Sequence, residues 1–231
     1  MCSNYRPVTS MDRMLTFFGV EREKDEIPRD IFPLSLAPFI RLSTEGQEGG
    51  KPALVAEDGE FGLNPGSWAK LEYGRKTYNA RAETVDQKIS FKGAWFKAQR
   101  CIIPAEGIYE PNYETGQAVR WLIQQAGSVP MGIAGIYSRW RKPDGGEFLS
   151  FAMITVNADD HPFMKRFQKP GEEKRMVVIL DPKDYFGWLT VPVHEAKKYL
   201  QQWHGHLEGF PAPLARAPKS APLPPPQDEL F

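Results

Sequence analysis

The sequence has few cysteines and no long apolar run. Only two of its 231 residues are cysteines, Cys2 and Cys101, so it cannot carry the disulfide framework that holds small secreted domains together. No apolar stretch after the N-terminus could serve as a signal peptide, and none elsewhere is long enough to span a membrane. We therefore expect a reduced, cytoplasmic protein without a membrane anchor.

Net charge is also lacking. The 29 Lys and Arg residues balance 29 Asp and Glu residues, which argues against a uniformly basic nucleic-acid-binding surface but permits local patches. One such patch is expected, because residues 70–100 contain eight basic residues against three acidic ones. A solvated surface is the ordinary explanation for a basic run, and phosphate binding is the alternative.

Several standard catalytic motifs are missing. The sequence contains no GxxxxGK[ST], GxGxxG, GxSxG or HExxH pattern. It therefore does not indicate a nucleotide-binding site, the nucleophile elbow of an α/β-hydrolase or the zinc-binding helix of a metalloprotease. His204 and His206 have no third ligand in view, and we expect them at the surface rather than in a metal site. We predict no cofactor and no metal.

The residues that are present indicate a sheet-rich fold. Runs typical of strands, broken by Gly, Pro or Asp, occur at residues 100–105, 120–125, 131–137, 148–156 and 175–180. PALVAEDGEFGL at 52–63 reads as a hairpin that turns at Asp58 and Gly59. Helices are predicted up to Phe18, after Asp181, and over 194–203. This order predicts an α+β fold with an antiparallel, barrel-like β core and peripheral helices.

The C-terminal end has a different composition. Seven of the last 25 residues are proline, which favours an extended chain that does not pack. We therefore predict one domain over residues 1–208 and a proline-rich tail over 209–231.

The residue after the initiator methionine deserves a chemical explanation. Cys is small enough for Met1 to be removed, and removal would leave Cys2 with an α-amine and a thiol on adjacent carbons. These two nucleophiles can attack the same carbon atom. Cys101 lies beside Ile102 and Ile103, where a buried structural thiol is expected.

Four stretches together carry a family resemblance. They are Cys2 near the start, FGLNPGSWAK with TYNARAET at 61–84, RCIIPAEGIYE at 100–110, and TVNADDH with EKRMVVIL at 155–180. This order resembles the SRAP family of abasic-site processing proteins over residues 2–190. The resemblance implies that mature Cys2 captures the aldehyde of an abasic site in single-stranded DNA as a stable covalent adduct.

The resemblance also assigns roles to individual residues. Asn79 in NARAET would orient the amine or the sugar, and Arg81 would bind phosphate. Glu110, in the motif GxYE, would act as the acid and base, whereas Glu106 is expected to be structural and Glu83 to pair with Arg81. Without the resemblance, Asn79 would be read as a turn asparagine and Glu110 as a solvated loop carboxylate.

The DNA contacts follow in the same way. Trp68 would stack on a base beside the lesion, with a core tryptophan as the alternative, and Pro38 would line the same surface. A second basic edge is expected around Arg166, formed by residues 165–175.

The family's catalytic histidine has no simple counterpart. Gln168 stands in its usual place, and His161 lies seven residues earlier. Either His161 takes over the role, or it caps the local turn and catalysis depends on Glu110.

The resemblance therefore predicts an enzyme that shields abasic sites by forming a thiazolidine through Cys2. A thiol peptidase, including self-removal of Met1, an abasic-site lyase that cuts the strand through an imine, and a non-catalytic single-strand binder are the alternatives. We expect a monomer that associates with the nucleoid and takes part in the DNA damage response. The final residues QDELF resemble a sliding-clamp motif through Gln227, Leu230 and Phe231, although these residues could also fold back onto the protein's own surface.

Overall fold

The computed structural model describes residues 2–22, 27–43 and 52–214 of the chain. Within these ranges the strands belong to one eleven-stranded sheet. The strands are β1 (Asn4–Pro7), β2 (Leu36–Leu42), β3 (Leu54–Phe61), β4 (Asn79–Arg81), β5 (Arg100–Asn112), β6 (Val119–Gln125), β7 (Met131–Arg141), β8 (Glu147–Asn157), β9 (Arg175–Val177), β10 (Ile179–Leu180) and β11 (Leu207–Pro211).

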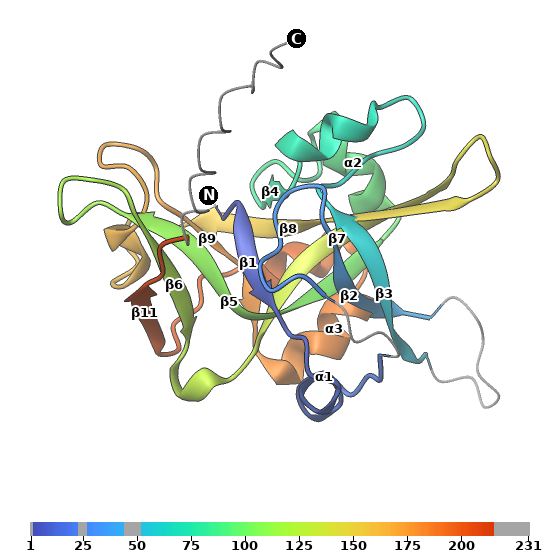
Figure 1. Cartoon of the computed structure of the whole chain (residues 1–231). Helices are drawn as coiled ribbons and strands as arrows, with labels where there is room; N and C mark the ends of the chain where they lie inside the picture. The colour runs from blue at the N-terminus through green and yellow to red at the C-terminus, as the bar shows by residue number, and fades with distance from the viewer. Residues whose placement is uncertain (1, 23–26, 44–51, 215–231) are drawn as a thin grey trace, which may run out of the picture.

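Five of these strands close on themselves. β7 pairs with β8, β8 with β3, β3 with β2, β2 with β5, and β5 again with β7, which completes a small barrel (Figure 1). Four of the five pairings are antiparallel, and β3 with β8 is parallel. The predicted barrel-like β core is thus confirmed as a mixed barrel with added strands.

The barrel interior is filled by large side chains. Phe61 packs on Phe151 and on Tyr5 of β1, with ring centroids 5.6 and 5.3 Å apart, and Phe39 lies 5.5 Å from Phe151. All four rings are fully buried. Because β1 contributes Tyr5 to this cluster, the N-terminal strand is held firmly against the barrel.

Helices lie around the barrel. They are α1 (Met11–Phe18), α2 (Ile89–Phe96), α3 (Tyr185–Thr190) and the 3-10 segments η1 (Leu71–Lys76), η2 (Ala126–Ser128), η3 (Met164–Arg166), η4 (Pro182–Asp184) and η5 (Val193–Tyr199). Among the described residues, no helix is both long enough and apolar enough to cross a membrane.

The helix predicted up to Phe18 is confirmed as α1. Ser10 caps it by accepting a hydrogen bond from the Arg13 amide, and Gly19 ends it with a φ of 68°. This left-handed conformation is the one that glycine adopts without strain. At the other end of the chain, Asp181 caps the segment that leads into α3, as predicted.

The hairpin predicted at Asp58 and Gly59 is wrong. Residues 54–61 form the single strand β3, which pairs with β2 from Leu42↔Leu54 to Leu36↔Glu60. Gly59 provides close packing instead of a turn, because a Cβ there would lie 2.8 Å from the Phe39 ring. A glycine inside a strand commonly marks such a close approach.

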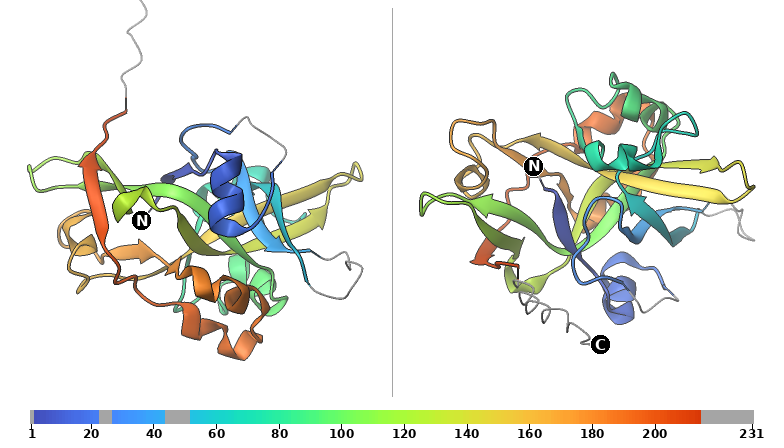
Figure 2. Two further views of the ribbon diagram at one scale, coloured as in Figure 1. Left: turned by 90° about the horizontal axis from the view of Figure 1, so that it is seen from below. Right: turned by 45° about the horizontal axis from the view of Figure 1, so that its top comes forward.

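The C-terminal region also differs from the prediction. Instead of a helix over 194–203, the chain forms the short 3-10 segment η5 and then β11, which pairs with β6 (Figure 2). The boundary predicted at residue 208 therefore falls inside β11. Gly209 allows close packing there, because its position approaches the rings of Phe163 and Trp121. The clamp-like residues Gln227, Leu230 and Phe231 lie outside the described residues.

Candidate functional site

Cys2 lies two residues before β1 and is almost completely buried, with 1% of its surface exposed. β1 runs antiparallel to β5, with Asn4 opposite Tyr109. The Cys2 thiol donates a hydrogen bond to the Asn4 carbonyl oxygen at 3.2 Å. The strand pairing therefore places Cys2 next to the segment of β5 that carries Glu110.

Asn79 reaches the same point from another strand. It begins β4, which pairs in parallel with β8, and its Nδ2 donates a 2.8 Å hydrogen bond to the carbonyl oxygen of Cys2. The Asn79 Oδ1 atom is shielded from solvent and accepts no hydrogen bond from the described residues. That oxygen is therefore available to a group that enters beside Cys2.

Glu110 is the third member of the cluster. It lies on β5 with 1% of its surface exposed. Burial raises the pKa of its carboxyl group to about 7, while a hydrogen bond from the Gln168 side chain acts in the opposite direction. Burial, and then the nearby charge of Glu110, raises the pKa of the Cys2 thiol far above its usual range. A carboxyl group with a pKa near 7 can both give and take a proton at neutral pH.

Gln168, which stands in the sequence where the family's catalytic histidine is expected, lies beside Glu110. Its side chain is buried and forms two hydrogen bonds with the main chain of Arg175. Gln168 Nε2 donates to the Arg175 carbonyl oxygen at 2.8 Å, and Gln168 Oε1 accepts from the Arg175 amide nitrogen at 3.0 Å. The main-chain N–H of Gln168 donates a hydrogen bond to the Pro111 carbonyl oxygen at 2.7 Å. A φ of 65° holds this residue in a conformation that few residues other than glycine adopt.

His161 is engaged in a different way. Its Nε2 lies 2.7 Å from the Trp203 carbonyl oxygen, and its Nδ1 accepts hydrogen bonds from the amides of Phe163 and Met164 at 3.2 and 3.0 Å. Both ring nitrogens thus bind main-chain groups, and Nδ1 caps the turn that contains Phe163 and Met164. Of the two alternatives that the sequence left open, these contacts favour the turn cap.

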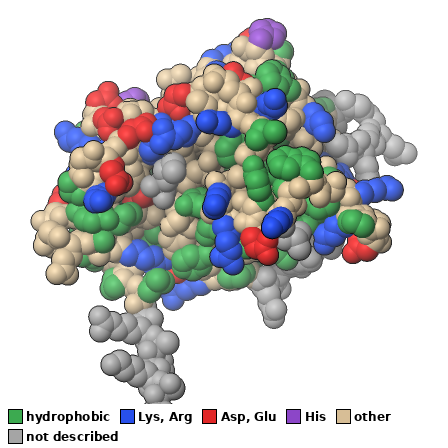
Figure 3. Space-filling model, turned by 90° about the horizontal axis from the view of Figure 1, so that it is seen from above, with side chains coloured by type: hydrophobic (Ala, Val, Ile, Leu, Met, Phe, Trp, Pro, Cys, Tyr) green, Lys and Arg blue, Asp and Glu red, His purple; other side chains and the backbone are tan. Residues whose placement is uncertain are grey.

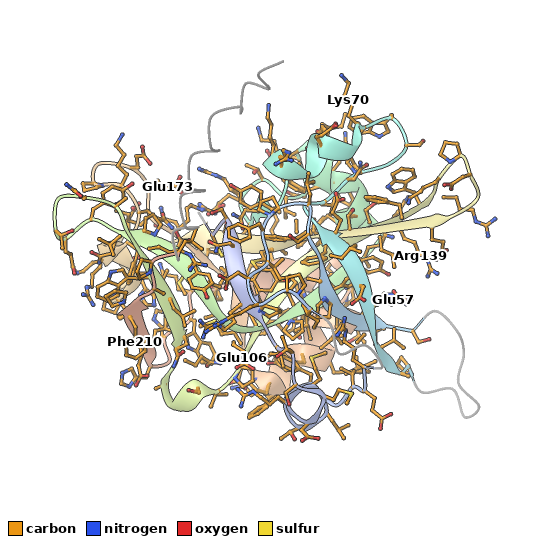
Figure 4. All side chains as sticks on the ribbon, in the orientation of Figure 1. Glu57, Lys70, Glu106, Arg139, Glu173 and Phe210 are labelled. Atoms are coloured by element: carbon orange, nitrogen blue, oxygen red, sulfur yellow. The ribbon has the colours of Figure 1, made fainter. Side chains whose placement is uncertain are left out.

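The predicted phosphate-binding residues are exposed but already paired. Arg81 donates to Glu173, which lies near β9 (Figure 4), at 2.8 Å, and Arg166 makes two hydrogen bonds with Glu114. The expected pair of Arg81 with Glu83 is wrong. Glu83 instead binds Arg175, because β9 places this buried arginine beside it.

The basic edge predicted over residues 165–175 is largely neutralised. Arg175 is buried and bonded to Glu83, Glu173 and the Thr155 carbonyl oxygen. Lys174 donates to the main-chain oxygens of Gln168 and Lys169. Sequence reasoning missed the structural role of Arg175, whose only signal was its place before the apolar run MVVIL.

The two residues expected to contact bases differ in exposure. Trp68 is 60% exposed and touches Tyr73 edge to face, with centroids 5.7 Å apart. The core tryptophan alternative is therefore wrong. Pro38 lies within β2 and is buried, so its side chain offers no open surface to DNA. Glu106 is structural as expected, because both its oxygens bind the Arg13 guanidinium.

Tyr78 is a neighbour of the site that sequence reasoning missed. It is half-buried, and burial followed by the charges of Cys2 and Glu110 raises the pKa of its hydroxyl. Its place immediately before Asn79 was the available signal. Among the described residues, no group of three His, Cys, Asp or Glu side chains could hold a metal ion.

Comparison with known proteins identifies relatives over most of the chain. A family model described as SOS response associated peptidase (SRAP) matches residues 1–212. The chain is 29% identical over 209 residues to the abasic site processing protein YoqW of Bacillus subtilis (strain 168), covering 87% of this chain and 85% of that protein. Abasic site processing protein HMCES of Gallus gallus is 29% identical over 177 residues, which are 64% of this chain and 49% of that protein.

A solved structure supports the fold. A protein from Bordetella bronchiseptica superposes with a TM-score of 0.82 at 36% identity, covering 92% of this chain and all of that one. At this similarity the two chains share their fold.

Proposed function

Because the chain belongs to the SOS response associated peptidase (SRAP) family, we propose that it processes abasic sites in DNA by capturing them covalently through Cys2. The relatives named abasic site processing proteins support this proposal. The observation that carries it is the convergence of three strands, which bring Asn79 into contact with Cys2 and place Glu110 beside the thiol.

Capture begins with the amine of Cys2 after Met1 has been removed. The neutral amine adds to the aldehyde carbon of the ring-opened abasic sugar, and loss of one water molecule gives an imine. The thiol sulfur then adds to the same carbon, its proton passes to the nitrogen, and a five-membered thiazolidine closes. Roughly a tenth of an α-amine with a pKa near ~8 is neutral at pH 7, far more than of a lysine amine with a pKa near ~10.4. Oriented ring closures gain effective molarities on the order of 10⁵ M or more.

Each neighbouring residue has a defined part in this scheme. Asn79 holds the main chain of Cys2 through Nδ2, and its unbonded Oδ1 would accept a proton of the mature amine. Glu110 would donate a proton to the departing water, and it would relay the thiol proton to the nitrogen as the ring closes. Arg81 would exchange its ion pair with Glu173 for a phosphate of the strand.

The same geometry is poorly suited to a thiol peptidase. Such an enzyme lowers the pKa of its thiol with a neighbouring imidazole, whereas burial and Glu110 raise the pKa of the Cys2 thiol. His161 uses both ring nitrogens on the main chain. These contacts favour capture over peptide hydrolysis.

A denaturing gel tests the proposal against the lyase alternative. Mature protein mixed with a labelled single-stranded oligonucleotide that carries one abasic site should give a slow-migrating adduct that survives heating, with the strand uncut. Accumulation of nicked DNA without an adduct would support a lyase. No reaction at all would reject both.

A further inference from the structure

The strand that leads away from Cys2 is held on both of its edges. One edge of β1 pairs with β5, which lies beside it in Figure 1. On the other edge, the Tyr5 amide donates a hydrogen bond to the Ile31 oxygen at 3.1 Å, and the Ile31 amide donates one to the Tyr5 oxygen at 2.8 Å. The segment before β2 therefore fixes β1 against β5.

Side chains join the same segments. The Tyr109 hydroxyl on β5 donates a hydrogen bond to Asp30 Oδ1 at 2.7 Å and accepts one from Arg6 Nη2 on β1 at 3.1 Å. Arg120 on β6 donates to Asp30 Oδ2 at 3.0 Å. We call Arg6, Asp30, Tyr109 and Arg120 the Tyr109 cluster. A single phenol thus connects β1, β5 and the segment that precedes β2.

The Tyr109 cluster combines two guanidinium groups with one carboxylate. The Arg120 guanidinium carbon lies 3.3 Å and that of Arg6 5.9 Å from the centre of the Tyr109 ring. Both arginines are partly buried, unlike the Lys and Arg side chains that stand out over the face shown in Figure 3. Like charges repel more strongly where water is reduced. Asp30 is therefore the group that allows both guanidiniums to stay against one ring.

The main chain of Tyr109 reaches the reactive thiol. Burial raises the pKa of the Cys2 thiol, and a main-chain hydrogen bond with Tyr109 acts in the opposite direction. Tyr109 also lies opposite Asn4 of β1 and directly before Glu110 on β5. A movement of Tyr109 would therefore change the surroundings of the Cys2 sulfur and the position of Glu110 together.

We propose that Tyr109, fixed by Asp30, is a positioning residue for the second chemical step, in which the Cys2 thiol closes the ring. In that step a bond forms between sulfur and the imine carbon, and the thiol proton passes to the nitrogen. The first step requires the amine and the aldehyde carbon to meet, whereas closure also requires the sulfur and Glu110 to be in place. A misplacement of about 1 Å can cost roughly 10²-fold in rate. The inference rests on the proposed function.

The variant Tyr109→Phe removes only the hydroxyl that Arg6 and Asp30 share. At a temperature where the variant is fully folded, its single-turnover capture of an abasic single strand should be roughly tenfold slower than that of wild type. Borohydride reduces an imine to a permanent amine link but leaves a closed thiazolidine unchanged. The fraction of early product trapped by borohydride should therefore rise several-fold in the variant. Slower capture without more trapped imine would overturn a role in ring closure.

A second variant tests whether Asp30 acts through Tyr109. Asp30→Asn keeps an oxygen for the Tyr109 hydroxyl but removes the charge that balances Arg6 and Arg120. It should also slow capture and raise the fraction of trapped imine. Because Asp30 and Tyr109 share one hydrogen bond, the double variant should be about as slow as the slower single variant. Rate losses that multiply in the double variant would overturn the shared action.

Tyr137→Phe is the matched control. Tyr137 is another buried tyrosine, but it lies on β7 and packs against Phe39 in the barrel wall, with ring centroids 5.4 Å apart. This variant should keep the wild-type rate and the wild-type fraction of trapped imine. Equal rates in wild type and in the Tyr109 and Asp30 variants would overturn the inference and leave capture intact. A wild type that forms no adduct would overturn the proposed function itself.

Discussion

Glu110 is the residue on which the proposed proton transfers depend. Its burial raises the pKa of the carboxyl group to about 7, so the carboxylate that accepts the thiol proton forms as pH rises through neutrality. The rate of capture should therefore rise with one inflection near pH 7 and a second that follows the α-amine of Cys2, whose ordinary pKa is ~8. Glu110→Gln should remove the first inflection, keep the second, and slow capture by roughly 10²-fold or more.

The control for this prediction is Glu106→Gln. Glu106 lies on the same strand but binds Arg13 instead of the site, so the variant should keep the wild-type pH profile. The measurement is the single-turnover rate of adduct formation across pH. An unchanged profile in Glu110→Gln would assign the proton transfers to another group.

Variants at Gln168 and His161 should have different effects, one on the rate of capture and the other on stability. His161→Ala leaves two main-chain amides without an acceptor, so it should lower the free energy of unfolding by about 1–3 kcal/mol while the capture rate of folded protein stays unchanged. Gln168→Ala removes the hydrogen bond to Glu110 and should slow capture. Denaturant unfolding and single-turnover rates measure the two effects.

A larger loss of rate in His161→Ala than in Gln168→Ala would return the catalytic role to His161. The variant Gln168→His provides the complementary measurement. If it speeds capture, position 168 is the place where a histidine acts in this fold.

The sequence predicted part of this residue-level arrangement. Cys2, Asn79 and Glu110 were predicted from motifs that are local in the chain, and the fold brings these motifs together. The contact between Gln168 and Glu110 was not predicted, because it depends on the path of the loop between β8 and β9. Short spacing made His161 a candidate, but spacing does not reveal that both of its ring nitrogens bind the main chain.

At the scale of elements, β4, β8 and β9 form the ladder that supports Asn79. β4 and β9 both pair with β8 at Thr155, and Arg175 of β9 donates to the Thr155 carbonyl oxygen. Composition alone predicted Arg175 as part of an exposed basic edge. Its burial follows from the pairing of β9, which a three-residue strand hardly signals in sequence.

This ladder gives a prediction for Arg175→Met. The variant removes the hydrogen bonds that this buried guanidinium donates to Glu83, to Glu173 and to the Thr155 carbonyl oxygen, so it should lower the free energy of unfolding by about 3 kcal/mol. Capture should weaken as well, because β4 carries Asn79. Arg166→Met is the control; its exposed pair with Glu114 should contribute less than about 1 kcal/mol. Equal destabilisation of the two variants in urea would contradict this account.

The same scale explains the failed hairpin. Asp58 and Gly59 form a common turn pair, and only the length of the β2 partner shows that the strand continues through them. Pairing with β2 keeps residues 58 and 59 in an extended strand, although Asp-Gly favours a turn. The sequence of β2, LAPFIRL, contains a proline, which makes this strand harder to predict.

At the scale of the whole molecule, the sequence predicted a barrel-like sheet but not how the barrel closes. Closure requires β3 and β8 to run parallel, and these strands are separated by almost ninety residues along the chain. Strand patterns identify which segments are strands. They do not reveal which distant strands become neighbours.

The end of the domain can be tested by truncation. A chain that stops after residue 214 keeps β11 and should fold and capture abasic DNA like wild type. A chain that stops after residue 208 loses the pairs of Gly209, Phe210 and Pro211 with β6, so its melting temperature should fall by several degrees. Equal melting temperatures would show that the predicted boundary was adequate after all.

The tail beyond residue 214 carries a separate proposal. A peptide ending in QDELF should bind a bacterial sliding clamp weakly through Gln227, Leu230 and Phe231, and tethering there would raise the local concentration of the protein to about the mM range. Calorimetry with the peptide measures this binding. A peptide with Leu230→Ala and Phe231→Ala is the matched control, and equal heats from both peptides would reject the motif.

The intact mass of the protein after reaction with an abasic oligonucleotide tests the central claim most directly. Wild type should lose Met1 and then gain the mass of the oligonucleotide minus one water molecule, without a reducing agent, and proteolysis should place the adduct on the peptide that begins with Cys2. Cys2→Ala should give no stable product. An adduct of the same mass and durability in Cys2→Ala would contradict capture through the aminothiol of Cys2.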